Sequence, residues 1–451
     1  MFRSRLAAER ESDVTTSRAR HPNYPTQHLY IISFVHLLVC TTTCWYISRV
    51  ANTSKIRLNT GGTLDPDVGQ IWDREALIEE IERTLLVQSV YFTGERRMGK
   101  TSVISKMRAQ SGARFLVVYI DVEQIKSAGD FASIVYSKVT AALPALAKAR
   151  GSMARGFKRR FGISKLGVGP VSVEFSEIVE KHWPDVLDEV VNALGTADDK
   201  RQIVVCFDEL PQLLKNIVNA GEPLVARQVL DKLRELRQTH LGVRMIFTGS
   251  IGLHQVERDL RQFGSSWAPI NDMKKIDIPS FDPADAEGLA EVLLTNEAVP
   301  CNDLIAVAAA IADRSDGVPY YIHWIVDGLL KRRSAVTAAT VDEVVADALD
   351  DPDDAWGFRH QVNRVPEYYG EDQDLAYAVL DIVSQAPGLT FEELMRRVPA
   401  HTELDSRHGN RVRSLVELLE RDHYLDASGG HLAFRRGLMQ RAWKAKRYLA
   451  G

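Results

Sequence analysis

Cysteine is scarce in this sequence, and its spacing excludes two common roles. The 451 residues include four cysteines, at positions 40, 44, 206 and 301, and no pair has the CxxC spacing of a zinc knuckle. Four scattered thiols are also too few for the disulfide framework of a secreted protein. We therefore expect a protein of a reducing compartment without a structural metal.

Other patterns are missing as well. None of the twelve histidines lies in an HExxH motif, which argues against a metalloprotease. Neither sign of charge dominates, because 56 lysines and arginines stand against 60 aspartates and glutamates, a formal net charge of −4. Nucleic-acid binding would therefore depend on local basic segments. The apolar share of 45 % is enough for the cores of roughly two to four domains.

The amino-terminal region differs from the rest of the chain. Charged residues are absent between Arg20 and Arg49, and residues 29–47 contain 14 apolar residues of 19. This run is barely long enough to span a bilayer. Three interpretations stay open: a membrane anchor with its carboxyl side in the cytosol, an extension translated from a wrongly chosen start codon, or a buried helix. We place residues 1–58 outside the fold.

The strongest motif is a glycine-rich loop. Residues 94–101 read GERRMGKT and fit GxxxxGK[ST] at every required position. A short apolar stretch at 89–93 predicts a buried strand before the loop, and the pattern at 101–109 predicts the opening of a helix after it. Strand, loop and helix therefore follow one another in the order of a phosphate-binding site.

Each residue type in this loop has a chemical reason. Gly94 and Gly99 let the backbone wrap a phosphate, and the loop N–H groups together with the helix end attract the anion. Lys100 is expected to reach the β- and γ-phosphates of ATP. The hydroxyl of Thr101 is expected to bind Mg²⁺.

Two later strands end in polar residues. Residues 202–209 read QIVVCFDE, and a run that is apolar on both faces is typical of a central parallel strand. Asp208 is expected to hold the Mg²⁺ shell, and Glu209 to orient and deprotonate the attacking water. A strand at 243–247 precedes Thr248, which could sense the γ-phosphate or that water, although strand ends often carry such residues as turn formers.

Two more apolar runs, at 115–121 and 275–278, complete a set of five strands separated by helical patterns. Alternation of strands and helices predicts right-handed crossovers and a parallel sheet, and hence an α/β fold. In such sheets ligands bind at the carboxyl edge.

These motifs resemble those of the AAA-like ATPases often called archaeal ATPases, which belong to the wider STAND group of signal-transducing P-loop ATPases. GERRMGKTS is similar to the family's GxRRxGKTS loop, and FDELPQLL to its DE-x-P strand end. Three further segments are similar to its entry motif, its third strand and its lid helix: IWDREALIEEIERTL at 71–85, MIFTGSIGL at 245–253 and GVPYYIHWI at 317–325. The likeness covers residues 60–450.

The resemblance implies a RecA/AAA-like core with a helical lid and a carboxyl-terminal winged helix. It places Arg97 and Ser102 at the nucleotide with the rest of the loop. It also implies that Gly317 and Pro319 close the lid over the adenine, while residues 68–72 form the other wall.

One departure from the family pattern concerns arginine. The lid helix at 317–330 contains none, so the lid arginine that many AAA+ motors use on the γ-phosphate is missing. This suggests a slow switch and not a fast motor. Arg258 and Arg261 could act on the nucleotide of a neighbouring copy or serve as structural charges.

The chain divides into five expected segments. They are an amino-terminal extension (1–58), the ATPase core (59–280), the lid (281–348), an acidic irregular linker (349–372) and the winged helix (373–451).

Two basic segments bear on nucleic-acid binding. The third helix of the winged helix presents Arg411, among other arginines, but residues 371–451 hold twelve acidic and twelve basic side chains. Residues 150–165 are basic and, with the glycines beside them, suggest a protruding hairpin. For both segments a solvated face is the alternative.

Two functions follow. The first is a switch driven by ATP and Mg²⁺ that acts on a protein partner or on its own assembly. The second is an ATP-licensed DNA-binding protein resembling origin initiators or transposition ATPases, with binding that is weak and tolerant of sequence. ATP chemistry favours the cytoplasm, with attachment to its membrane face if residues 29–47 form an anchor.

Overall fold

The computed structural model describes residues 56–61, 70–142, 147–161, 173–196, 200–249, 252–261, 267–398 and 406–449. The chain from Ser54 to Gly451 forms one compact unit. The apolar run at 29–47 lies outside the described residues, so its three interpretations stay predictions. Within the described ranges, no helix is long and apolar enough to cross a membrane.

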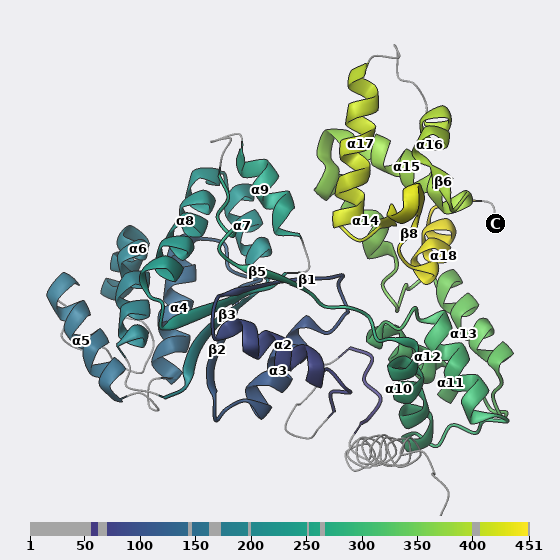
Figure 1. The fold of residues 1–451 in the computed structure, drawn as a ribbon, viewed down its shortest axis with the longest axis horizontal. Helices are drawn as coiled ribbons and strands as arrows, with labels where there is room; N and C mark the ends of the chain where they lie inside the picture. The colour runs from purple at the N-terminus through teal and green to yellow at the C-terminus, as the bar shows by residue number, and fades with distance from the viewer. Residues whose placement is uncertain are drawn as a thin grey trace, which may run out of the picture. The chain divides into compact units, whose positions relative to one another are not determined.

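In the described part of the chain, five parallel strands form one sheet in the order β2-β3-β4-β1-β5 (Figure 1). They are β1 (Val90–Thr93), β2 (Phe115–Asp121), β3 (Gln202–Asp208), β4 (Val243–Phe247) and β5 (Lys274–Asp277). Each lies within one residue of its predicted bounds, because β-branched and aromatic runs of this length favour buried strands. Asp121 pairs with Asp208, so the polar ends of these strands meet at the carboxyl edge.

Different helices cover the two faces of the sheet. Val204 and Cys206 belong to one core, which also contains the lid, α2 (Glu75–Leu85) and α3 (Lys100–Gln110). Val205 and Phe207, which alternate with them along β3, belong to the other core. That core is completed by α4 (Ala128–Ala142), α6 (Val173–Gly195), α7 (Leu210–Asn219), α8 (Pro223–Thr239) and α9 (Leu253–Arg261).

Residues 147–161 of the basic segment form a helix and not an arm of the predicted hairpin, whereas residues 162–172 lie outside the described residues. Residues Ala147–Phe161 form α5, and the sequence from Val173 onward is α6. Met153 and Phe157 recur at helical spacing and are buried in the core. A β-carbon at Gly156 would collide with the Glu189 carboxylate of α6, so this glycine permits close helix packing and does not mark a turn.

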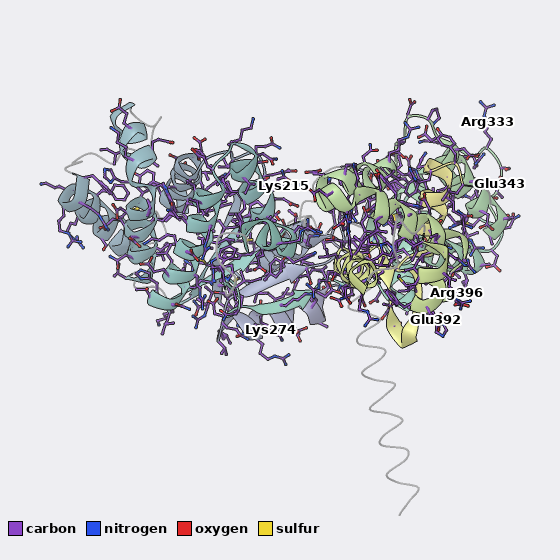
Figure 2. All side chains as sticks on the ribbon, turned by 90° about the horizontal axis from the view of Figure 1, so that it is seen from above. Lys215, Lys274, Arg333, Glu343, Glu392 and Arg396 are labelled. Carbon is purple, nitrogen blue, oxygen red and sulfur yellow. The ribbon has the colours of Figure 1, made fainter. Side chains whose placement is uncertain are left out.

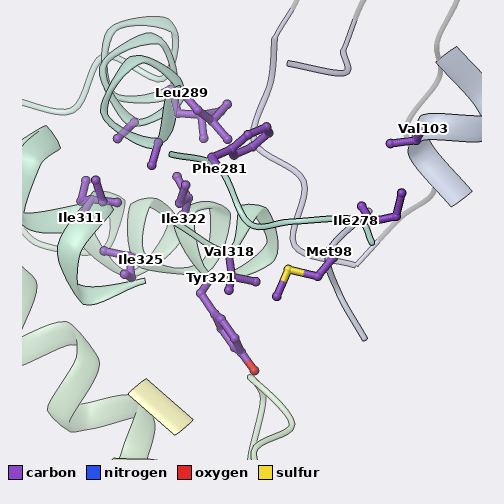
Figure 3. Close-up of a cluster of buried hydrophobic side chains, with 14 of the residues drawn as sticks. Met98, Val103, Ile278, Phe281, Leu289, Ile311, Val318, Tyr321, Ile322 and Ile325 are labelled. Carbon is purple, nitrogen blue, oxygen red and sulfur yellow. The ribbon is translucent and has the colours of Figure 1, made fainter. Parts of the chain in front are cut away.

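The lid consists of α10 (Pro283–Asn296), α11 (Leu304–Arg314), α12 (Pro319–Leu330) and α13 (Ala338–Asp350). Side chains of Asp282, Asp303 and Thr337 accept a hydrogen bond from the third residue of the helix that each precedes, which fixes three of the four starts. Figure 3 shows Ile322 and Ile325 of α12 in the apolar cluster under the lid.

Residues 56–59 pack on this lid and do not belong to the amino-terminal extension. Ile56 is 3 % exposed, and its carbonyl accepts a hydrogen bond from Asn296 at 2.8 Å. The N–H of Leu58 donates to Glu297 at 3.1 Å. The predicted boundary after residue 58 is therefore about three residues too late, because an isolated apolar side chain gives too weak a signal to locate it.

The predicted irregular linker contains a helix, α14 (Arg359–Tyr369), whose turns run through Pro366. Proline has no N–H to donate to the carbonyl of Val362. The hydroxyl of Tyr377 donates to that carbonyl instead, at 3.2 Å. The tolerated proline depends on a residue from the next helix, which explains why reading Pro366 as a loop residue failed.

The carboxyl-terminal part has the order of elements of a winged helix and its own apolar core. Among its described residues a small antiparallel sheet has the order β6-β8-β7. The elements are α15 (Gln373–Gln385), β6 (Leu389–Thr390), α16 (Phe391–Arg397), α17 (Ser406–Arg421), β7 (Leu425–Asp426), β8 (His431–Phe434) and α18 (Gly437–Lys446).

Candidate functional site

The glycine-rich loop joins β1 to α3 at the carboxyl edge of the sheet. Gly94 has φ 130°, and a β-carbon there would lie 2.9 Å from the carbonyl oxygen of Ile278. Gly99 has φ 82° and is the residue before α3. Both positions require glycine, so the loop can turn tightly and direct its N–H groups inward.

Lys100 is buried at the start of α3. Its Nζ donates to the carbonyl oxygens of Gly94 at 2.8 Å and Glu95 at 2.9 Å. Burial lowers the pKa of Lys100 to about 8, although Glu209 and other carboxylates nearby oppose this shift. A cation held in this way is suited to bind an anion inside the loop.

Asp208 ends β3 and is 4 % exposed. Thr101 donates to its Oδ2 at 2.8 Å, and Thr248 donates to its Oδ1 at 2.7 Å. A second donor to Oδ2 is the hydroxyl of Tyr119, at 2.6 Å. The structure thus brings together three of the residues singled out from the sequence and adds one that was missed.

The chemistry of this donor set fits Mg²⁺. The Thr101 hydroxyl and the Asp208 carboxylate supply the hard oxygen atoms that Mg²⁺ prefers, with substrate phosphates expected to supply others. In the residues that the structure describes, no cluster of three or more His, Cys, Asp or Glu side chains competes for a metal.

Glu209 follows Asp208 and begins the turn into α7. Its backbone is left-handed, with φ 61°, and it directly precedes that helix. The N–H of Leu210 donates to the carbonyl of Thr248 at 3.0 Å, which ties the end of β3 to the end of β4. Ser250 lies outside the described residues.

A second part of the site is a small cavity of about 40 Å³ between the loop and the lid. Trp72, Gly99, Ser102, Pro319 and His323 are among its lining residues. The described end of the segment at 68–72 and Pro319 therefore line the same cavity. Gly317 does not line this cavity.

Gly317 instead contacts the backbone of Phe281, just before the first lid helix. Its carbonyl accepts a hydrogen bond from the N–H of Phe281 at 2.9 Å, and a β-carbon there would lie 2.4 Å from the Phe281 oxygen. The Phe281 ring in turn lies 4.2 Å from the guanidinium carbon of Arg74, a residue of the cavity lining.

His323 is neutral in this cavity. Burial lowers its pKa to about 4. The backbone N–H of Asn59 donates to its Nδ1 at 3.1 Å, which places the ring proton on Nε2. The segment at 56–59 therefore fixes the tautomer of a residue beside the predicted adenine site.

Arg97 contacts the lid with its guanidinium. Its guanidinium donates to the Tyr321 hydroxyl at 2.9 Å and lies 4.2 Å from the centre of the Tyr320 ring. Figure 3 shows Tyr321 projecting from the lid beside the apolar cluster. Arg97 therefore joins the loop to the lid, which the motif alone did not predict.

The two residues before Arg97 contact the carboxyl-terminal part of the chain. Arg96 donates to Nε2 of His360 at 2.8 Å, and burial keeps the pKa of His360 at about 4, so this ring is a neutral acceptor. Glu95 accepts from Nε of Arg436 at 3.1 Å. Both of these side chains are largely buried, with 10 % and 14 % exposed.

Arg436 also contacts the lid and the segment that joins β5 to the lid. It donates to Ser280 Oγ at 2.9 Å and to the carbonyl of Asp316 at 3.4 Å. The Asp316 carboxylate accepts from the N–H groups of Gly437 and Leu438 at the start of α18. One arginine of the carboxyl-terminal part therefore joins the loop, the segment after β5 and the lid.

A second cavity, of about 400 Å³, lies beside the loop and the winged helix. Its lining includes Gly94, Glu95, His254 and Asp422.

The backbone carbonyl of Tyr368 accepts from Arg258 at 2.7 Å, so Arg258 has the structural role that was one of its two interpretations. Lys215, labelled in Figure 2, adds an ion pair from α7 to Glu367 of α14 at 2.6 Å.

No family model and no curated protein matches this sequence. The chain is similar to the Walker-type ATPase PABY2304 of Pyrococcus abyssi, with 13 % identity, 83 % of this chain and 97 % of that chain covered, and a TM-score of 0.57. The ORC2 protein of Aeropyrum pernix is 12 % identical over 83 % of this chain and 93 % of its own, with a TM-score of 0.47. The chain therefore shares the fold of PABY2304, a RecA/AAA-like parallel sheet with helices on both faces.

Proposed function

We propose that this chain is an ATP-driven molecular switch that hydrolyses ATP slowly. One observation carries the proposal: the loop built to bind phosphate also holds the winged helix, through Glu95 and Arg436. A change in the loop on nucleotide binding therefore acts directly on the carboxyl-terminal part. The lid helix lacks an arginine for the γ-phosphate, which supports slow turnover.

The residues of the site have distinct roles in this proposal. Lys100 exchanges the carbonyls of its own loop for the β- and γ-phosphates, and the loop N–H groups bind the same anion. Thr101 and Asp208 hold Mg²⁺, which, when bound, neutralises phosphate charge. Glu209 accepts a proton from the attacking water, and Thr248 orients Asp208.

The lid completes the nucleotide site. We infer that Pro319 and Trp72 enclose the adenine, with Ser102 and Gly99 at the start of α3 below it. The cavity of about 40 Å³ is smaller than a base, so the lid and the core must move apart when nucleotide enters. Arg97 and Arg436 link both moving parts to the loop.

DNA binding is the weaker alternative, because several basic residues of the candidate segments form ion pairs within the chain. Arg411 of α17 forms an ion pair with Asp372. Arg447 pairs with Asp381 at 2.7 Å, and Arg160 of α5 pairs with Asp185. The output of the switch is then a protein partner or self-assembly, in the cytoplasm where ATP is available.

Substitution of two residues separates binding from chemistry. Lys100→Ala is expected to lose ATP affinity, because the point charge on the phosphates is removed. Glu209→Gln is expected to keep or tighten ATP binding and to abolish hydrolysis. Nucleotide binding and phosphate release are measured on both variants and on Lys215→Ala, which lies outside the site. Native turnover by Glu209→Gln would show that the general base is a different residue.

A further inference from the structure

Tyr119 of β2 is a hydroxyl donor at the proposed magnesium site that no sequence motif contains. Its side chain is partly buried, and its hydroxyl lies 2.6 Å from Asp208 Oδ2. Thr101, the expected metal ligand, donates to the same oxygen at 2.8 Å. One carboxylate oxygen therefore accepts from two different elements, α3 and β2.

The strand register explains why Tyr119 reaches this position. Tyr119 pairs with Cys206, and Asp121 pairs with Asp208, across the parallel strands β2 and β3. Side chains two residues apart lie on the same face of a strand, so Tyr119 and Asp208 share the face that α3 covers. Arg108 of α3 lies over the Tyr119 ring, 5.7 Å from its centre, and packs it from outside.

The arrangement leaves the Asp208 carboxylate little freedom. An oxygen of a carboxylate has two lone pairs, and Thr101 and Tyr119 occupy both lone pairs of Oδ2. Thr248 donates to Oδ1, so the open lone pair of the group is on Oδ1. The three donors fix the plane of the carboxylate and leave a defined direction for a metal-bound water or the ion itself.

We propose that Tyr119 is a positioning residue of the magnesium site, whose hydroxyl holds Asp208 in the orientation that binds the ion. The inference rests on the proposed function, because it requires nucleotide and Mg²⁺ at this loop. Removal of a hydrogen-bond partner of a metal ligand typically lowers metal affinity about 10- to 100-fold. Without Tyr119, Thr101 and Thr248 would still donate to Oδ2 and Oδ1, but the second donor to Oδ2 would be lost.

The test is Tyr119→Phe, measured by binding of a fluorescent ATP analogue. With EDTA and no added metal, we expect the affinity of this variant to match that of the native chain. In a Mg²⁺ titration, we expect the concentration at half-maximal binding enhancement to rise about tenfold. At saturating Mg²⁺, turnover should return to the native rate, because Tyr119 acts on ion binding and touches neither phosphate nor water.

Tyr377→Phe is the matched control, since it also removes one hydroxyl, which donates to the carbonyl of Val362 in α14. Its Mg²⁺ midpoint should be native. Thermal unfolding of both variants checks that they are folded. A native midpoint in Tyr119→Phe, or an equal shift in both variants, would overturn the inference. If the native chain bound no nucleotide, the proposed function itself would fail, so the two failures are distinct.

Discussion

The charge of the buried Lys100, whose ammonium donates to two carbonyls of its own loop, is expected to change at mildly alkaline pH. Lys100 has a pKa of about 8 because burial disfavours its charge. Bound phosphates would favour the charged form and raise that pKa. Above pH 8 the free protein therefore holds fewer protons than the complex, and binding takes up a proton.

The affinity for ATP is accordingly expected to fall as pH rises above about 8, by at most about tenfold per pH unit. Calorimetry in buffers of different ionisation enthalpy measures the proton uptake directly. In Lys100→Arg the guanidinium stays protonated, so its weaker binding should be independent of pH in this range. Constant native affinity from about pH 7.5 to 9.5 would contradict the role of Lys100.

Individual site residues differ in how far the sequence could predict them. Thr101 and Asp208 were found because each lies at a fixed position in a local motif, and the structure joins them by a hydrogen bond. Tyr119 and Arg436 were missed, because their partners lie 89 and 341 residues away. A tyrosine near the carboxyl end of an aliphatic strand is the one available signal for Tyr119.

At the scale of elements, periodicity predicted the strands better than it predicted two helices. Strands such as β3 are apolar on both faces, so their bounds are set by composition alone. Gly156 lies within α5 and faces the Glu189 side chain of α6, and in α14 the hydroxyl of Tyr377 donates to the carbonyl that Pro366 leaves without an N–H donor. Both glycine and proline signal turns in isolation, and tertiary contacts override that signal here.

The short segment at 56–59 gives an element-scale prediction for stability. Ile56→Ala removes a side chain that is 3 % exposed and is expected to destabilise the lid by about 2 kcal/mol. Ile305→Ala is the matched control, because Ile305 is 71 % exposed and should change stability by less than about 0.5 kcal/mol. Denaturant unfolding measures both. Equal effects would show that residue 56 belongs to the extension after all.

At the scale of the whole molecule, contact between the loop and the winged helix depends on a largely buried ion pair. Burial raises the pKa of Glu95, and Arg436 opposes that shift. Arg435 also lies 3.7 Å from the Glu95 carboxylate, so loss of Arg436 leaves Glu95 with the more distant of its two cations. The pair therefore sets how firmly the winged helix is held while the loop is in this conformation.

Arg436→Met is expected to loosen this contact and to speed release of bound nucleotide several-fold. Glu95→Gln in addition to Arg436→Met should recover part of the lost stability, since the buried carboxylate that only the more distant Arg435 pairs with is gone. Stopped-flow release of a fluorescent nucleotide and thermal unfolding give the two readouts. Arg396→Met, at a side chain that is 69 % exposed, is the control (Arg396 is labelled in Figure 2). A native release rate in Arg436→Met would contradict the coupling of nucleotide binding in the loop to the carboxyl-terminal part.

The last prediction concerns DNA binding. The whole sequence carries a formal net charge of −4, so binding depends on local basic side chains. Arg155 and Lys158 of α5 are exposed, whereas Arg160 is paired with Asp185. Each neutralised phosphate adds about −0.9 to the slope of log affinity against log salt, so two or three contacts give a shallow slope. We expect micromolar or weaker binding that tolerates sequence changes.

Charge reversal at Arg155 and Lys158 should reduce this binding, and Arg411→Ala should leave it unchanged because Arg411 already pairs with Asp372. Fluorescence anisotropy with several unrelated duplexes, between about 50 and 200 mM salt, measures affinity and slope together. A base-reading Arg411 would instead cost about 1 to 3 kcal/mol on one sequence when removed. Nanomolar binding to a single duplex, lost on Arg411→Ala, would therefore favour the DNA-binding function over the switch, since the helix would then have to release Asp372 to reach a base.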